Sequence, residues 1–367
     1  MAKILIVGTD TMGIYNHRLE LIQALADSGH EVVVAALDGP EKEFILRTGC
    51  RFIGTPVENR GMNPFADARL FAVLMKVVKK ESPDVVYTFY TKTNIYGGLV
   101  ARICGVPYIV NVTGLGSAIG KGGMLSRFMM ALYRQAVAKA GCIFFQNEFN
   151  REFFVKRGIR TDVHRMLPGS GVSLTRYREL PFPEGETVGF LYISRIFREK
   201  GIDEYLEAAE TIRSRHPDTR FHVVGPCDAT EYKLKLSEME RRGIISYHGM
   251  TLDSHPFIAQ CQCMVYPSYY FEGVANVLLE SQASGRPVIT TTVPGCRETV
   301  DDGVNGFLVP PKDVGSLESA IERFLALPVG SRKAMGQAAR RKMEREFDRR
   351  RVVDAYLDET AKILIKK

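Results

Sequence analysis

Short apolar runs and amphipathic segments alternate along most of this chain, and this alternation constrains its fold more than any other feature. In the first half we expect strands at residues 3 to 8, 31 to 36, 84 to 88, 107 to 112 and 142 to 146. We expect helices at 15 to 28, 66 to 80, 94 to 104, 125 to 139 and 149 to 157. Strands that alternate with helices favour an α/β fold with parallel sheets and helical crossovers.

A segment rich in proline and glycine, Leu-Pro-Gly-Ser-Gly-Val at residues 167 to 172, interrupts this series. A second series of expected strands follows it, at residues 189 to 193, 221 to 225, 245 to 248, 264 to 266 and 287 to 290. We therefore predict two doubly wound, Rossmann-like domains that face each other across a cleft, with boundaries at 1 to 168 and 169 to 349. An apolar-periodic helix is expected at 350 to 365.

Two carboxylates, Glu272 and Glu280, flank a glycine-containing turn that opens an apolar helix. The apolar strand at 263 to 268 ends just before the turn, and open α/β sheets bind ligands at the carboxyl ends of their strands. Free N–H groups of residues 273 to 277 would hold phosphate at the positive end of the helix. Glu272 could accept hydrogen bonds from sugar hydroxyls, and Glu280 from ribose. The alternative is a pair of solvated glutamates, as is common on helices.

This pair is accompanied by three further motifs, at residues 285 to 291, 294 to 303 and 305 to 310. Together they resemble the retaining glycosyltransferases of family four, which have the GT-B fold, and the likeness covers nearly the whole chain. The resemblance implies that the last helix crosses back, so that residues 350 to 367 complete the first domain. It also implies that the first domain binds the acceptor and the second the nucleotide-sugar donor.

Residues 193 to 201, Ile-Ser-Arg-Ile-Phe-Arg-Glu-Lys-Gly, resemble the family element that binds the donor diphosphate, which assigns that role to Arg195 and Lys200. Two fixed cations would stabilise the charge that develops on the leaving oxygen, without a metal. By the same resemblance, Glu272 positions the sugar, and the leaving phosphate takes the acceptor proton during retention. The expected catalytic residues are Arg195, Lys200 and Glu272. The expected donor-binding residues are Gly225, Gly249, Met250, Gly273, Val274, Ala275, Asn276, Val277 and Glu280.

Three segments of the first half resemble those of a family subgroup that acts on polyprenyl-diphosphate-linked acceptors. They are residues 15 to 18, 91 to 94 and 111 to 118. On that resemblance Arg18 and Lys92 bind the acceptor diphosphate, although either could be a solvated charge at a helix end. Many relatives have a histidine near the position of Thr113. This chain has no histidine there, so a role centred on a histidine has no support. The expected acceptor-binding residues are Arg18, Lys92, Asn94, Thr113, Gly114, Gly116 and Ser117.

The net charge of +7 lies entirely in the first half: residues 1 to 170 contain 21 Lys and Arg against 14 Asp and Glu, and residues 171 to 367 contain 28 of each. No nucleic-acid-binding signature accompanies this charge, so an anionic membrane is the favoured partner. A glycine-rich, amphipathic segment at 120 to 134 has the composition of an interfacial helix, although methionine and phenylalanine at helical spacing usually belong to a core. The cluster expected to touch lipid is Lys121, Met124, Arg127, Phe128 and Met129.

No run of 18 apolar residues occurs, and the opening residues 1 to 8 are expected to form a buried strand because they are too short for a secretory leader. The seven scattered cysteines suit a reducing compartment. We therefore expect a cytoplasmic protein at the inner face of the membrane. The leading hypothesis is a glycosyltransferase that moves a hexose or N-acetylhexosamine from a UDP-sugar co-substrate to a lipid-linked saccharide, with no other cofactor. A sugar-nucleotide epimerase and a non-catalytic sugar-nucleotide-binding subunit remain as alternatives.

Overall fold

The computed structural model describes residues 1–56, 63–114 and 123–366, and it divides into two compact units. The first unit comprises Met1–Gly171 with Arg349–Lys367, and the second comprises Val172–Asp348. The boundaries predicted after residues 168 and 349 fall three residues and one residue from these positions.

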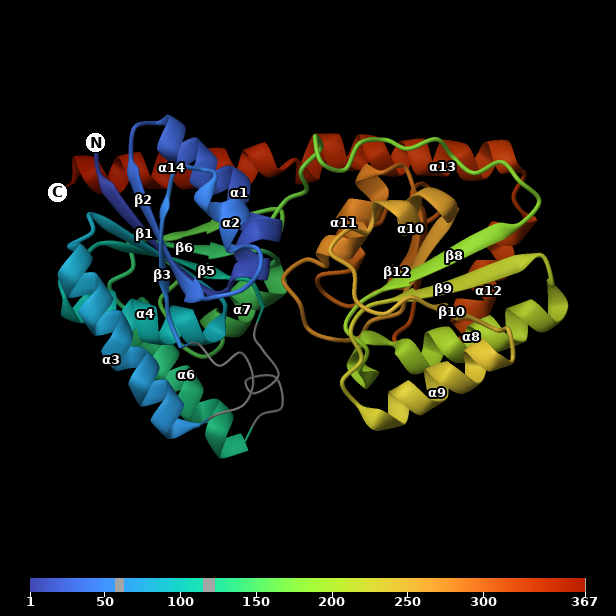
Figure 1. Cartoon of the computed structure of the whole chain (residues 1–367), viewed down its shortest axis with the longest axis horizontal. Helices are drawn as coiled ribbons and strands as arrows, with labels where there is room; N and C mark the ends of the chain where they lie inside the picture. The colour runs from blue at the N-terminus through green and yellow to red at the C-terminus, as the bar shows by residue number, and fades with distance from the viewer. Residues whose placement is uncertain (57–62, 115–122, 367) are drawn as a thin grey trace. The chain divides into compact units, whose positions relative to one another are not determined.

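The first unit is built on a seven-stranded parallel sheet with the order β3-β2-β1-β4-β5-β6-β7 (Figure 1). Its strands are β1 Lys3–Asp10, β2 Glu31–Leu37, β3 Arg51–Gly54, β4 Val85–Phe89, β5 Tyr108–Val112, β6 Cys142–Phe145 and β7 His164–Met166. Its helices are α1 Thr11–Asp27, α2 Lys42–Leu46, α3 Pro64–Glu81, α4 Thr91–Ile103, α6 Gly123–Val137, α7 Glu148–Val155 and α14 Arg349–Ile365.

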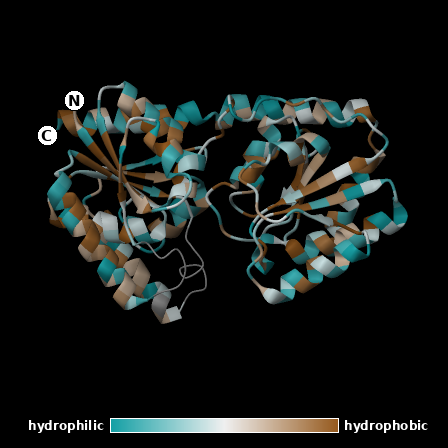
Figure 2. Ribbon diagram, in the orientation of Figure 1, coloured by the Kyte–Doolittle hydropathy of each residue, from teal (hydrophilic) through white to brown (hydrophobic). Residues whose placement is uncertain are grey.

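Helices cover both faces of this sheet because successive strand residues point to opposite sides. Leu5 and Val7 pack on one side with side chains of α3, α4, α6 and α7. Ile4 and Ile6 pack on the other side with α1, α2 and α14. The strands are accordingly coloured as hydrophobic along most of their length, whereas the helices around them carry both hydrophilic and hydrophobic residues (Figure 2).

The second unit contains a six-stranded parallel sheet with the order β10-β9-β8-β11-β12-β13. Its strands are β8 Val188–Ile193, β9 Thr219–Val224, β10 Ser246–Tyr247, β11 Cys263–Tyr266, β12 Val288–Thr291 and β13 Gly306–Val309. Its helical segments are η1 Arg198–Lys200, α8 Ile202–Arg215, α9 Thr230–Arg241, α10 His255–Gln260, α11 Asn276–Ala283, η2 Arg297–Thr299, α12 Val314–Ala326, α13 Val329–Lys342 and the π-helix η3 Met343–Phe347. The fold class predicted from the sequence, two doubly wound α/β domains, is confirmed.

The last helix, α14, belongs to the first unit, as predicted. The ring of Tyr356 lies 4.5 Å from the ring of Phe144 and 5.1 Å from that of Tyr87, measured between centroids. The Tyr356 hydroxyl also accepts a hydrogen bond from the Asn111 amide at 2.7 Å. A buried aromatic cluster thus fixes the helix to its sheet. The cluster includes Tyr356, so residues 1 to 171 alone do not complete it.

Within the described ranges, no helix combines the length and the apolar character that crossing a membrane requires.

Candidate active site

In each sheet, the connections that follow two adjacent strands run in opposite directions at one place, the topological switch point. Open α/β sheets bind ligands at such switch points. In the second sheet this place lies between β8 and β11, which pair in parallel. Arg195 and Lys200 follow β8, and Glu272 follows β11. In the first sheet it lies between β1 and β4, which precede Arg18 and Lys92. The sequence-predicted charges therefore lie at the two switch points.

Lys200, Tyr266 and Glu272 form a connected group at the switch point of the second sheet. The Lys200 ammonium donates to the Glu272 carboxylate and to the Tyr266 hydroxyl, which lies 2.7 Å from Nζ. The Tyr266 hydroxyl donates to the same carboxylate oxygen at 2.7 Å. The side chain of Lys200 is 8% exposed and that of Glu272 is 20% exposed. A cation and a carboxylate predicted separately thus form one ion pair, which a buried tyrosine bridges.

Aromatic rings surround this ion pair. The Lys200 ammonium lies 5.0 Å from the ring centroid of Tyr270 and 6.0 Å from that of Phe197, within the range of cation–π attraction. Burial raises the pKa of Tyr266 well above its ordinary value, and the adjacent Glu272 carboxylate raises it further. The tyrosine therefore stays protonated and remains a hydrogen-bond donor to Glu272.

The turn that carries Glu272 is held by a second turn at Gly295. Gly295 has a φ of +93°, and a Cβ at this position would lie 2.9 Å from the Gly273 carbonyl oxygen. The Gly295 carbonyl accepts a hydrogen bond from the Ala275 N–H at 2.9 Å. The Pro-Gly-Cys motif at 294 to 296 thus has a physical role: only a residue without a side chain allows this close approach.

The same contact corrects one prediction about phosphate binding. The Ala275 N–H, expected to be free, is occupied by the Gly295 carbonyl, and the Val274 and Ala275 side chains lie in the core. Asn276 and Val277 open α11, where the first N–H groups of a helix have no acceptor within the helix. The Asn276 Oδ1 atom is buried and has no hydrogen-bond partner within the part of the chain that the structure describes. The Asn276 side chain therefore offers a buried polar atom to a ligand at the start of α11.

Three further donor-site residues, Gly225, Gly249 and Met250, follow β9 and β10 at the same edge of the sheet. A Cβ at Gly225 would lie 1.7 Å from the Ser194 carbonyl oxygen, so this position requires glycine. The Gly225 N–H donates to the Gly249 carbonyl at 2.7 Å, and the Met250 side chain is exposed. These contacts hold the loops after β8, β9 and β10 beside one another.

Glu280, on α11, lies beside Tyr177, a residue that the sequence reasoning did not identify. Burial raises the pKa of Tyr177, and the Glu280 carboxylate adds to this rise. The Tyr177 ring stacks on His255 with centroids 4.6 Å apart. The carboxylate predicted to bind ribose therefore has a rigid aromatic neighbour.

Arg195 differs from the other predicted catalytic residues because it is exposed. Its guanidinium carbon lies 5.2 Å from the ring centroid of Phe197. No ion pair or hydrogen bond joins it to Lys200 or Glu272 in the described structure.

Arg18, in the first unit, is fully buried and does not fit the alternative of a solvated helix-terminal charge. Its Nη1 donates to the His17 carbonyl at 3.1 Å, and its guanidinium carbon lies 4.3 Å from the ring centroid of Phe89. Burial lowers its pKa. Among the described residues, none accepts a hydrogen bond from its buried Nε and Nη2 atoms. A buried cation with two unsatisfied donors is costly unless an anion binds there.

The other acceptor candidates differ in outcome. Lys92 forms an ion pair with Asp67 at 3.0 Å, so it is neither solvated nor uncompensated. Asn94 is fully buried, and its amide nitrogen donates to the Asn111 carbonyl and the Tyr133 hydroxyl, both at 2.7 Å. Its buried Oδ1 atom has no hydrogen-bond partner among the described residues, so a role of Asn94 in the acceptor site stays a prediction. Thr113 and Gly114 follow β5 and are half-buried, whereas Gly116 and Ser117 lie outside the described residues.

The segment predicted to touch lipid forms α6, and the structure corrects one of its members. Met124 and Phe128 are 88% and 56% exposed, but Met129 is 3% exposed and packs in the core. The helical phase turns it by 100° from Phe128 and by about 140° from Met124, toward the core. Arg127 is exposed, and Lys121 lies outside the described residues.

Comparisons with known proteins identify the class. A family model described as glycosyl transferases group 1 matches residues 177–342, and one described as a glycosyl transferase 4-like domain matches residues 12–169. The chain therefore belongs to the family-four glycosyltransferases with the GT-B fold, and it is a glycosyltransferase.

Two curated relatives cover most of the chain. It is 26% identical over 329 residues to N,N'-diacetylbacillosaminyl-diphospho-undecaprenol alpha-1,3-N-acetylgalactosaminyltransferase of Campylobacter jejuni, covering 85% of this chain and 86% of the relative. It is 24% identical over 333 residues to UDP-Gal:alpha-D-GlcNAc-diphosphoundecaprenol alpha-1,3-galactosyltransferase of Escherichia coli, covering 85% of this chain and 84% of that protein.

Solved structures agree on the fold. Sucrose-phosphate synthase of Thermosynechococcus elongatus superposes with a TM-score of 0.81 at 18% identity, with both chains fully covered. HepE of Anabaena, solved in complex with UDP and glucose, gives a TM-score of 0.80 at 17% identity and covers 99% of this chain and 100% of its own.

Proposed function

We propose that this glycosyltransferase moves a hexose or N-acetylhexosamine from a UDP-sugar to a polyprenyl-diphosphate-linked saccharide, with retention and without a metal. The observation that carries the proposal is the Lys200 ammonium held on the Glu272 carboxylate at the switch point of the second sheet. The family assignment disfavours the epimerase alternative.

The donor chemistry follows from this pair. Arg195 and Lys200 supply positive charge where the diphosphate leaves, and fixed charge there stabilises the transition state more than the ground state. As the diphosphate binds, it competes with Glu272 for the ammonium, and Tyr266 keeps its own hydrogen bond to the carboxylate. Glu272 then remains oriented toward the sugar.

Retention is proposed to proceed by attack from the face that the leaving group occupies. The acceptor hydroxyl oxygen forms a bond to the anomeric carbon while the bond from that carbon to the phosphate oxygen breaks. The electron pair stays on the phosphate oxygen, which takes the acceptor proton. Glu272 stabilises positive charge on the sugar ring and does not attack it. The names of both curated relatives specify an alpha linkage, the outcome that retention gives from an alpha-linked donor.

Independence from a metal is part of the proposal. In the described ranges, no three or more His, Cys, Asp or Glu side chains are grouped so that they could share a metal ion. The charge of the diphosphate is instead assigned to Arg195 and Lys200.

Arg18 supports the acceptor class. Both curated relatives are named for acceptors that carry a sugar on diphospho-undecaprenol. A buried guanidinium with two unsatisfied donors at the switch point of the first sheet suits a diphosphate, because guanidinium groups bind phosphate oxygens in bidentate geometry. We place the protein peripherally at the cytoplasmic membrane face, where a lipid-linked acceptor would be presented.

A UDP-release assay tests this function. Purified protein is incubated with a panel of UDP-sugars, with and without a polyprenyl-diphosphate-linked saccharide, and a matched acceptor that carries one phosphate serves as control. We expect one donor to be consumed, and only with the diphosphate acceptor. Interconversion of the UDP-sugar alone would favour the epimerase, and binding without turnover would favour the non-catalytic subunit.

A further inference from the structure

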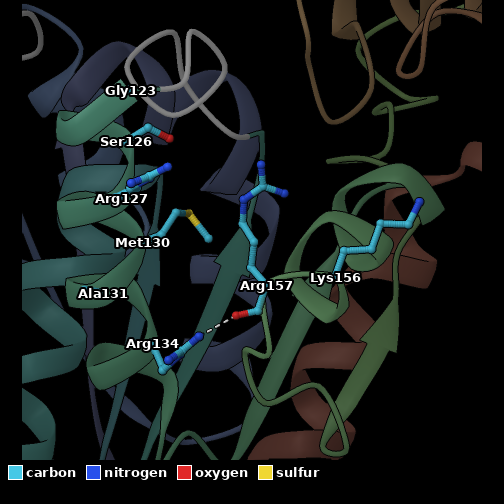
Figure 3. A pocket seen from close by; sticks show the side chains of 8 residues that line it. All are labelled: Gly123, Ser126, Arg127, Met130, Ala131, Arg134, Lys156 and Arg157. Atoms are coloured by element: carbon cyan, nitrogen blue, oxygen red, sulfur yellow. Dashed lines mark hydrogen bonds between the residues drawn. The ribbon is translucent and has the colours of Figure 1, made fainter.

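A groove of about 600 Å³ lies between α6 and the C-terminal end of α7 in the first unit, and Arg127, from the segment expected to touch lipid, lines it (Figure 3). Its lining consists of Gly123, Ser126, Arg127, Met130, Ala131, Arg134, Lys156 and Arg157. Four of these eight residues are cationic and none is acidic. The groove is therefore a concentration of positive charge around a small polar space.

Contacts around the groove leave most of this charge uncompensated. Arg134 Nη2 donates to the Arg157 carbonyl at 2.5 Å, which ties α6 to the end of α7 (Figure 3). Lys156 pairs with Glu152 at 3.2 Å. In the part of the chain that the structure describes, Arg127, Arg134 and Arg157 form no ion pair with a carboxylate. Three guanidinium groups therefore face the groove with no carboxylate partner.

An apolar stripe lies next to this charge on the same helix. Met124 and Phe128 are one helical turn apart and both are exposed. Arg127, Ala131 and Arg134 recur at spacings of four and three residues, so they form the neighbouring face. A ligand that bridges the two faces needs an anionic group attached to an apolar body.

We propose that this groove binds the phosphate of an anionic phospholipid headgroup, while Met124 and Phe128 enter the acyl layer. The inference rests on the membrane association proposed above and assigns it a specific site. Arginine forks recognise phosphate oxygens through paired hydrogen bonds, and shallow apolar insertion adds a separate contribution. A soluble phosphate would satisfy the guanidinium groups but leave Met124 and Phe128 in water, so we assign the groove to a lipid.

Sedimentation with vesicles of phosphatidylcholine, with or without phosphatidylglycerol, tests the site. The test variant is Arg127→Gln with Arg157→Gln, which leaves in place the hydrogen bond from Arg134 to the Arg157 backbone carbonyl. Removal of two cations near a membrane surface should raise the lipid concentration for half-binding about thirtyfold. The matched control is Arg241→Gln with Arg351→Gln, which removes the same charge from two exposed positions outside the groove. It should bind almost as the unaltered protein does.

Two further measurements separate a built site from diffuse attraction. Arg127→Lys with Arg157→Lys keeps the charge but removes the guanidinium groups that form paired hydrogen bonds to phosphate. We expect the lipid concentration for half-binding to rise about threefold or more. Phe128→Ser should weaken binding at constant charge. Equal losses in the groove variant and its control, or unchanged binding by the lysine variant, would overturn the proposal. Tight binding of glycerol phosphate in the absence of vesicles, with Phe128→Ser neutral, would assign the groove to a soluble phosphate instead.

Activity toward a detergent-solubilised acceptor is measured in parallel. If the groove variant keeps this activity and loses vesicle binding, the headgroup site holds independently of the catalytic proposal. Absence of transfer by the unaltered protein would contradict the proposed function and leave the vesicle result to stand alone.

Discussion

Replacement of Lys200 by methionine is the perturbation that most directly probes the connected group at the second switch point. Methionine keeps an apolar stem of similar length among Phe197 and Tyr270, and it removes the ammonium. The change deletes the ion pair with Glu272 and the 2.7 Å hydrogen bond to Tyr266, and it leaves the Tyr266 donation to Glu272 in place.

Two magnitudes follow. Removal of one fixed charge from the site of the leaving phosphate should lower kcat by about a hundredfold or more. A carboxylate that loses its ammonium partner in a mostly buried position should lower the free energy of unfolding by about 1 to 3 kcal/mol. The stability cost is discounted from that of a fully buried pair because the Glu272 side chain is 20% exposed.

The assay is UDP release at saturating donor and acceptor, with urea unfolding of the same preparations. Lys333→Met is the matched control, because Lys333 forms an exposed ion pair with Glu184 at 2.7 Å in the same unit. It should leave both quantities nearly unchanged. Arg195→Ala should lose a comparable factor in kcat without a loss of stability, since its side chain is exposed. A folded Lys200→Met protein within threefold of the original kcat would refute the assignment.

Three further predictions concern other residues of the second unit. Glu280→Ala should weaken UDP binding by about 1 to 3 kcal/mol, as expected for a lost charge-assisted hydrogen bond, and unchanged affinity in calorimetry would count against a ribose contact. Tyr266→Phe should lower kcat more than it changes KM for the donor, because the hydroxyl orients Glu272 and is not expected to bind the diphosphate; an effect on KM alone would contradict this positioning role. Burial, with His248 and Arg220, lowers the pKa of His222 to about 4. Because the unfolded chain then binds more protons between pH 6.5 and about 4, stability should fall as pH drops through this window, by at most about 3 kcal/mol. His222→Gln should flatten this dependence in urea unfolding, and an unchanged slope would show that other groups cause it.

Much of the fold could be predicted from the sequence because the central strands are buried on both faces and therefore read as apolar runs. The expected strands do not include β3, β7 or β13, which are short and lie at the sheet edges. In β3 and β7 the apolar pattern is broken by half-buried or exposed residues such as Arg51 and His164, whereas β13 is mostly buried. Helix starts were placed late where a side chain caps the first turn. Asp10 accepts a hydrogen bond from the Gly13 N–H at 2.7 Å, so α1 begins at Thr11 and not at residue 15.

The candidate site was predictable at the level of motifs but not of contacts. Glu272 and Lys200 lie 72 residues apart, and their ion pair depends on β8 and β11 being neighbours in the sheet. In the sequence Tyr266 is only the last residue of an apolar strand. The pairing of β8 with β11 brings its hydroxyl into contact with both Lys200 and Glu272. Its position directly before the glycine-containing turn was the available signal. Tyr177 lies in an irregular segment whose pattern carries no such signal.

The sequence alone does not decide which contacts a side chain on a helix makes. A polar residue in the first turn of a helix, such as Asn94, has the same sequence signature whether it faces a ligand or satisfies a buried carbonyl. Met129 likewise follows Phe128 directly, and the 100° step between them decides which of the two lies in the core.

The central claim is a retaining transfer, independent of a metal, to a diphosphate-linked acceptor, and one measurement tests all of it. The product formed from an alpha-linked UDP-sugar and a polyprenyl-diphosphate-linked saccharide in excess EDTA is isolated, and its anomeric configuration is determined by proton NMR. We expect an alpha-linked product at an undiminished rate. A beta-linked product, or transfer that stops until a divalent metal is restored, would contradict it.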